Sequence, residues 1–235
     1  MSWFVFAFLS GASDILYNFA TRNSLKNSSK SLEFSWAMTT LRSAIFLPAI
    51  FELTNSSLSF RHFVLLFGLG AITVINILIF MKMHSLNELS ISAIIVRLRT
   101  VWVPLVALVL IGERLVFTEY LGIFITFLAV AVISSPRRIV KDKAMSVALL
   151  FSITGSILGV AMKAASEIFS PNLIVLAMSL PSAVVLPLFA KDKVGLLLKS
   201  WSSDLKGKIV ITFFAILTPF FFATALAQGG TASAT

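Results

Sequence analysis

The chain has no cysteine, few charged residues and only two histidines. The lack of cysteine excludes disulfide bonds and metal or redox sites built on thiolates. Charged residues make up 12% of the 235 residues, whereas a soluble domain carries roughly a quarter, so lipid is the solvent for most of the chain. The histidines, His62 and His84, lack metal-ligand spacing, and the sequence shows no Ser-His-Asp set or phosphate-binding glycine loop. We therefore expect no metal, no cofactor and no enzymatic activity.

Long apolar runs dominate the chain instead. Hydrophobic residues make up 58% of it, and the mean hydropathy is +0.98. A helix needs about 20 mostly apolar residues to cross the hydrocarbon core, and backbone polar groups in lipid must be satisfied within the segment. We expect eight membrane-spanning helices, at residues 2–20, 34–51, 62–81, 91–111, 116–134, 144–163, 172–190 and 209–228. The sequence predicts an all-α, polytopic transmembrane helix bundle in the cell membrane, inner or plasma, with the lipid bilayer as a partner.

The positive charges of the chain, which has a net charge of +9, lie mostly between the expected spans. Thirteen lysines and arginines fall on one side of the membrane, and three fall on the other: Arg61, Arg114 and Lys163. This asymmetry is typical of the positive-inside rule and argues against a nucleic-acid partner. It places the N-terminus outside.

A short motif occurs twice. Residues 41–48, LRSAIFLP, return 139 positions later as residues 180–187, LPSAVVLP. Five expected spans separate the copies, so the second unit should cross the membrane in the opposite direction, as in the inverted repeats of secondary transporters. We expect a first five-helix unit at residues 1–135 and a second, incomplete three-helix unit at residues 144–235. On this alignment the chain stops where a ninth span would begin, and we expect a truncated or partial version of a ten-helix protein.

Three features follow one another near the end of the first unit: Pro104, a Gly112-Glu113 turn and Gly122. This order resembles the EamA domain, the repeat unit of the drug/metabolite transporter superfamily, with a proline in its fourth helix, a Gly-Glu-x-Leu turn and a glycine in its fifth helix. Arg42 in the second span also suits this family. The resemblance implies ten helices in two inverted five-helix repeats, and export or exchange of small metabolites. It also implies cytoplasmic termini, opposite to the orientation that the loop charges indicate.

Asp14, Arg42, Arg97 and Arg99 lie at least six residues from the nearer end of their expected spans. At a rise of 1.5 Å per residue they sit roughly 9–12 Å below the same, lysine-rich face. Such groups are costly in lipid unless they pair or face a cavity. Asp14 either belongs to a substrate or proton site, on one stripe with Asn18, or pairs with Arg42 to hold two helices together.

The two arginines of the fourth span, Arg97 and Arg99, are about 200° apart around a helix, so they cannot both face one cavity. The net positive charge of the cluster favours an anionic or zwitterionic substrate. The alternative is that the arginines reach for lipid headgroups and helix ends. Trp102 lies deeper and either lines a cavity or packs within the bundle.

Several glycines and prolines lie within the expected spans. Gly155 and Gly159 form a Gly-x-x-x-Gly pair in the sixth span, where we expect close helix packing. Prolines within spans remove a backbone donor and invite kinks, which act as hinges in a carrier or are merely tolerated. They are Pro48, Pro104, Pro187 and Pro219.

Together these features predict an integral membrane carrier. It would move a small metabolite, such as an amino acid, an amine or a similar organic solute, by alternating access and in the export direction. Protons are a candidate coupling ion, and the sequence sets no oligomeric state. A lipid flippase, an accessory membrane subunit and an inactive truncated remnant stand as alternatives.

Overall fold

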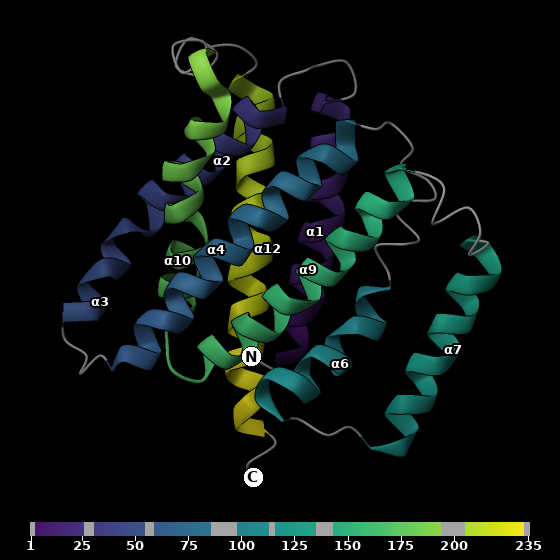
Figure 1. Cartoon of the computed structure of the whole chain (residues 1–235). Helices are drawn as coiled ribbons and strands as arrows, with labels where there is room; N and C mark the ends of the chain where they lie inside the picture. The colour runs from purple at the N-terminus through teal and green to yellow at the C-terminus, as the bar shows by residue number, and fades with distance from the viewer. Residues whose placement is uncertain are drawn as a thin grey trace. The chain divides into compact units, whose positions relative to one another are not determined.

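The computed structural model describes residues 3–25, 31–54, 59–85, 98–112, 116–134, 143–193 and 205–232. All regular elements within these ranges are helical (Figure 1). The α-helices are α1 (Trp3–Leu25), α2 (Ser31–Phe46), α3 (Phe51–Thr54), α4 (Phe60–Ser85), α6 (Arg99–Ile111), α7 (Phe117–Ser134), α9 (Lys143–Ser166), α10 (Pro171–Val185) and α12 (Leu205–Ala232). Two 3-10 helices, η1 (Leu47–Ile50) and η2 (Leu186–Lys193), directly follow α2 and α10. The prediction of an all-α chain is confirmed for the described residues.

Six of the helical segments are long and apolar enough to cross a membrane. They run over Trp3–Thr21, Leu32–Leu53, Phe60–Phe80, Met145–Ser166, Pro171–Phe189 and Leu205–Gly229, and each has 19 to 25 residues. They coincide with six of the eight expected spans. The span expected at residues 116–134 coincides with α7 (18 residues), and the one expected at 91–111 overlaps α6. Their apolar stretches, Val101–Ile111 and Tyr120–Ala129, are shorter than those of the other six. The length and composition of the helices mark the chain as an integral membrane protein.

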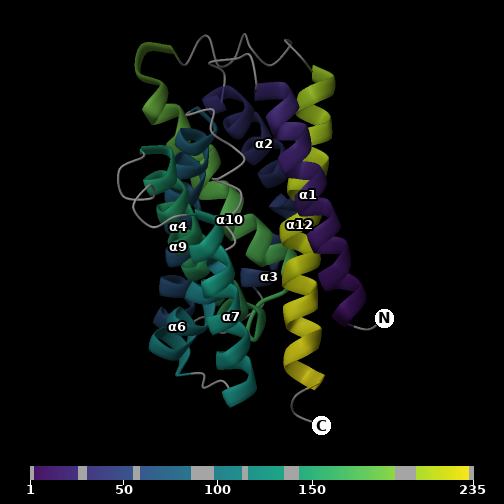
Figure 2. The same ribbon diagram turned by 90° about the vertical axis from the view of Figure 1, so that its right-hand side faces the viewer.

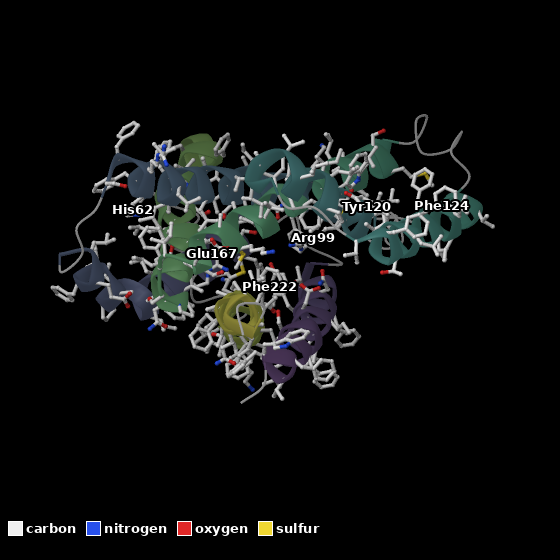
Figure 3. All side chains as sticks on the ribbon, turned by 90° about the horizontal axis from the view of Figure 1, so that it is seen from below. His62, Arg99, Tyr120, Phe124, Glu167 and Phe222 are labelled. Carbon is white, nitrogen blue, oxygen red and sulfur yellow. The ribbon has the colours of Figure 1, made fainter. Side chains whose placement is uncertain are left out.

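Large apolar side chains cover the outside of the helices. Phe8 on α1 is 67% exposed and Phe60 on α4 is 82% exposed. On α7, Tyr120 and Phe124 also belong to the exposed side chains (Figure 3). Such a surface is unfavourable in water but natural in a bilayer, whose tails are equally apolar.

Small hydroxyl side chains lie inside the helix packing instead. Ser179 on α10 donates to the carbonyl of Val175 at 2.8 Å, and Ser156 on α9 donates to that of Ser152 at 2.8 Å. Bonds of this kind satisfy a hydroxyl within its own helix, so it needs no water. The fully buried hydroxyl side chains are Thr39, Ser152, Ser156, Ser179 and Ser182.

The chain divides into two compact units. Unit 1 comprises Met1–Val74 and Met162–Thr235, and unit 2 comprises Ile75–Ala161. Helices α4 and α9 contribute residues to both. Within unit 1, α1 lies along α12 (Figures 1 and 2), and α2 packs against both α10 and α12. Unit 1 thus combines helices from both halves of the sequence, and the repeats at residues 1–135 and 144–235 stay a prediction.

The two copies of the repeated motif adopt the same local structure. α2 ends at Phe46 and passes into η1, in which Pro48 is the second residue. α10 ends at Val185 and passes into η2, in which Pro187 is the second residue. Proline lacks the N–H that continues an α-helix, so each copy tightens into a 3-10 helix at its proline. The two helices that carry the motif also pack against each other.

Candidate functional site

α1 and α12 lie side by side in opposite directions (Figure 2). Ser10 Oγ on α1 donates to the carbonyl of Thr218 on α12 at 3.0 Å. Four residues earlier on α1, the ring of Phe6 lies 6.1 Å from that of Phe221, three residues later on α12. This register places the residues that follow Ser10 on α1 beside the residues that precede Thr218 on α12.

α2 runs in the same direction as α12. Near its start, the ring of Phe34 lies 5.4 Å from Nζ of Lys208. Near its end, Phe46 stacks on Phe220 with 6.2 Å between the ring centroids. Between these contacts the two helices share a buried apolar cluster, formed by Phe34, Met38, Ile211 and Ala215.

Arg42 of α2 reaches across this apolar contact. Its side chain is 5% exposed, and Nη1 donates to the carbonyl oxygen of Ala215 on α12 at 3.2 Å. Nε is buried and has no hydrogen-bond partner among the described residues. A guanidinium carries five N–H donors, so Arg42 has donor capacity for a further oxygen. The burial places Arg42 inside the helix packing and not at the lipid headgroups.

Tyr17 of α1 contacts α2 one helical turn before Arg42, and the sequence interpretation missed it. Its hydroxyl donates to Sδ of Met38, four residues before Arg42, at 3.6 Å. Ser10, Asp14 and Tyr17 follow one another at intervals of four and three residues, which places them on one helical face. This spacing is the signal that could have identified Tyr17.

Asp14 and Asn18 lie at the exposed edge of the same region. Asn18 Nδ2 donates to the backbone carbonyl of Asp14 at 2.8 Å, so this amide bond lies within α1. The bond that the structure shows for Arg42 leads to α12 and not to Asp14. Both expectations for Asp14, a pair with Arg42 and a ligand or proton site, stay predictions.

Further polar side chains lie deep in the packing near the start of α12. Lys208 is 3% exposed and lies over the ring of Phe34. The sequence interpretation counted Lys208 in a loop, which is wrong because α12 begins at Leu205. A lysine stem is long and apolar enough to lie within such a contact, so hydropathy alone misplaces it. The hydroxyl of Thr212 is also buried, without a hydrogen-bond partner among the described residues.

Unit 2 contains an arginine against a surface of small residues. Arg99 is the first residue of α6 (Figure 3), and its backbone carbonyl accepts a bond from Ser156 Oγ at 3.2 Å. A Cβ added at Gly159 would lie 2.9 Å from Nη2 of Arg99, and one at Gly155 would lie 3.7 Å from Nε. The glycine pair on α9 therefore accommodates the side chain of Arg99.

The remaining candidates lie on α6 and α7. Trp102 is half-buried, and its Nε1 has no hydrogen-bond partner among the described residues. Pro104 lies inside α6, which ends at Gly112 with a φ of 69°, a left-handed conformation that favours glycine. Gly122 lies on α7 beside open space. Two candidates fall outside the described residues: Arg97 and Glu113.

No protein-family model, no curated protein and no solved structure matches the chain. The described residues contain no group of three His, Asp or Glu side chains that could hold a metal ion. They offer a buried cation and hydroxyl groups between apolar membrane-spanning helices. This set is suited to binding a polar solute by charge and hydrogen bonds.

Proposed function

We propose that the protein is a membrane carrier of the drug/metabolite transporter type, which exports a small organic solute by alternating access. The observation that carries the proposal is the buried guanidinium of Arg42 between three apolar helices. An arginine at the centre of a membrane helix costs at least about 2.5–3.5 kcal/mol and commonly marks a transport pathway. The described bond of Arg42 leads to a backbone carbonyl. A bound solute with an anionic group would supply a counter-charge.

The chemistry around Arg42 favours a solute with a carboxylate. A guanidinium binds a carboxylate through two parallel N–H···O bonds, and Nε of Arg42 has no hydrogen-bond partner among the described residues. Tyr17 adds a hydroxyl nearby, which donates to Sδ of Met38 one helical turn before Arg42. Asp14 suits the cationic end of a zwitterion, or a coupling proton. An amino acid or a similar metabolite combines these charges.

The repeated motif supports a carrier built from two related units. Both copies pass from an α-helix into a 3-10 helix at the proline, and the helices that carry them pack together. Inverted repeats provide the two exchangeable arrangements on which alternating access depends. The EamA-like features Pro104, Gly112 and Gly122 point to the same class.

Counterflow in proteoliposomes tests the proposal. Liposomes containing the purified protein are loaded with an unlabelled pool of amino acids, carboxylic acids or amines, and uptake of the matching radiolabelled pool is followed. A carrier accumulates label transiently above its equilibrium level, whereas protein-free liposomes do not. Transfer of fluorescent phospholipid between leaflets without counterflow of any pool would contradict the proposal and favour a lipid flippase.

A further inference from the structure

Pro181, Pro187 and Pro219 lie within helices of unit 1, and each leaves one backbone carbonyl without its helical donor. Because proline has no N–H, the carbonyl four residues before it cannot form the i→i+4 bond of an α-helix. Pro181 lies inside α10, Pro187 in η2 and Pro219 inside α12. The carbonyls concerned are those of Ala177, Ala183 and Ala215.

Two of these carbonyls accept a side-chain bond from α2. Arg42 Nη1 donates to Ala215 at 3.2 Å. Trp36 Nε1 donates to Ala183 at 3.0 Å. Pro219 and Pro187 each remove the helical donor of one carbonyl, and that same carbonyl accepts a bond from a side chain of α2. A buried carbonyl without a donor costs about 1–3 kcal/mol, so these bonds replace what the prolines remove.

The third carbonyl faces the backbone of α4. A Cβ added at Gly70 would lie 2.9 Å from the carbonyl oxygen of Ala177 and 2.5 Å from Cγ of Pro181. The Cα hydrogen of glycine takes that place, and such a hydrogen is a weak donor to carbonyls at helix contacts. Glycine therefore allows α4 to lie against the bend of α10.

The geometry of α2 explains how one helix can bond two others. Trp36 and Arg42 are six residues apart, which is about 240° around an α-helix. Their side chains consequently leave α2 in different directions, and α2 packs against both α10 and α12. Ser10 of α1 holds α12 from a further direction, through the carbonyl of Thr218 next to Pro219.

We propose that α2 acts as a clamp on two proline hinges, with Trp36 holding α10 at Pro187 and Arg42 holding α12 at Pro219. The conformation of α12 around Pro219 and the position of the Arg42 guanidinium are then coupled, because a guanidinium that turns away leaves the Ala215 carbonyl buried without a donor. An anion that binds the same guanidinium competes with this carbonyl. The clamp goes beyond the proposed function, since it exists whether or not a solute is carried.

A double-mutant cycle tests the clamp in purified protein without any solute. Arg42→Met removes the donor, and Pro219→Ala restores the helical N–H that the Ala215 carbonyl lacks. With Pro219 present, Arg42→Met should lower the midpoint of thermal unfolding by about 2–4 °C, the shift typical for one buried bond in a chain of this size. In the Pro219→Ala background it should lower the midpoint by less than about 1 °C, or raise it, because the carbonyl keeps its helical donor.

The matched control is Pro48→Ala, since Pro48 lies just beyond α2 and the bond of Arg42 leads elsewhere. The effects of Arg42→Met and Pro48→Ala should add. Equal effects of Arg42→Met with and without Pro219 would overturn the clamp. If Arg42→Met protein folds only when Pro219→Ala is also present, this rescue would support the clamp. A double-mutant cycle of Trp36→Phe with Pro187→Ala tests the second hinge separately. Additive effects on the midpoint of thermal unfolding would overturn the proposal that Trp36 holds α10 at Pro187.

Spin labels measure the hinge directly, because a chain without cysteine can be labelled at introduced positions alone. Ile209→Cys and Ala227→Cys flank Pro219 on α12, and the distance between the labels reports the bend. Arg42→Met should shift or broaden this distance distribution when Pro219 is present and leave it unchanged with Pro219→Ala. An unchanged distribution in both backgrounds would contradict the clamp. Neither experiment requires transport, so the clamp and the carrier can fail separately.

Discussion

Arg42 combines two properties that rarely occur together in a membrane helix, a charge and nearly complete burial. A buried charge without a counter-ion costs stability, and among the described residues the hydrogen bond of Arg42 leads to an uncharged backbone carbonyl. Its bond to the Ala215 carbonyl uses part of the guanidinium, and Nε has no hydrogen-bond partner among the described residues. Lysine would not be equivalent, because a compact ammonium cannot form two parallel bonds to a carboxylate.

Asp14 allows a test at the scale of one residue. Asp14→Asn keeps the size of the side chain and removes its charge. If Asp14 binds a cationic end or a coupling proton, counterflow should fall about tenfold or more, the equivalent of one lost charge-assisted bond, while the thermal midpoint stays close to that of the parent protein. Asn18→Ala, which leaves the Asp14 carboxylate in place, shows whether the amide on the same helical stripe also takes part. Unchanged counterflow with a lowered midpoint would instead show a structural pair.

Gly70 of α4 lies in close contact with Ala177 and Pro181 of α10. Gly70→Ala should destabilise the protein by about 1–3 kcal/mol, because the new Cβ would meet the ring of Pro181 at 2.5 Å and the carbonyl of Ala177 at 2.9 Å. Chemical unfolding measures the change. The control is Gly68→Ala on the same helix, which meets nothing within 4 Å and should gain up to about 1 kcal/mol of helix propensity. Equal stabilities of the two variants would contradict the contact.

Gly159→Ala, in the glycine pair on α9, should change stability less than Gly70→Ala. Both new Cβ atoms would lie 2.9 Å from a neighbouring atom. A Cβ at Gly159 would lie 2.9 Å from Nη2 of Arg99, which is the far end of a flexible side chain. Arg99 can move aside, and alanine favours the helix by about 1 kcal/mol, so Gly159→Ala should be neutral or slightly stabilising in the same unfolding assay. A loss as large as that of Gly70→Ala would mean that Arg99 is held rigidly in place.

The helices could largely be located from the sequence, because length and hydropathy are properties of each segment alone. The spans expected at residues 144–163 and 172–190 correspond to Met145–Ser166 and Pro171–Phe189. Lys208 was misplaced because a charged residue at a helix end resembles a loop residue in any hydropathy pattern. The fifth expected span, residues 116–134, corresponds to α7 (Phe117–Ser134), and the fourth overlaps α6 among the described residues.

The site could be predicted only in part, because its contacts join segments far apart in the chain. The sequence marked Arg42 and Asp14 as unusual by their depth. It could not show that Arg42 bonds a residue 173 positions later, since that depends on the register of α2 against α12. Tyr17 was missed because an aromatic residue in a span is ordinary until its neighbours are known.

The distribution of side chains over the whole molecule is the reverse of that in a soluble protein. Many phenylalanines, such as Phe8 and Phe60, are exposed, while Ser152 and Ser179 are buried, which fits a lipid environment. The sequence adds an expected orientation, because most lysines and arginines lie between or near the ends of the expected spans on one expected side of the membrane. The positive-inside rule predicts that this side faces the cytoplasm and that the turn between α9 and α10 faces outward.

Labelling of introduced cysteines tests this orientation. Ile168 lies in the turn after α9 and is 51% exposed, and the chain has no cysteine of its own. A membrane-impermeant maleimide should label Ile168→Cys in intact cells, and it should label Ser202→Cys, on the lysine-rich side, only after the cells are opened. The reverse pattern would give the orientation with cytoplasmic termini that the EamA resemblance implies.

The most direct test of the carrier is counterflow by two variants of Arg42, compared at equal protein content and after each is shown to be folded. Arg42→Gln keeps N–H groups that can bond the Ala215 carbonyl but has no charge, whereas Arg42→Lys keeps the charge. The account predicts that Arg42→Gln loses counterflow of carboxylate-bearing solutes and that Arg42→Lys retains part of it. Full counterflow by Arg42→Gln would contradict the claim that this buried cation binds the solute.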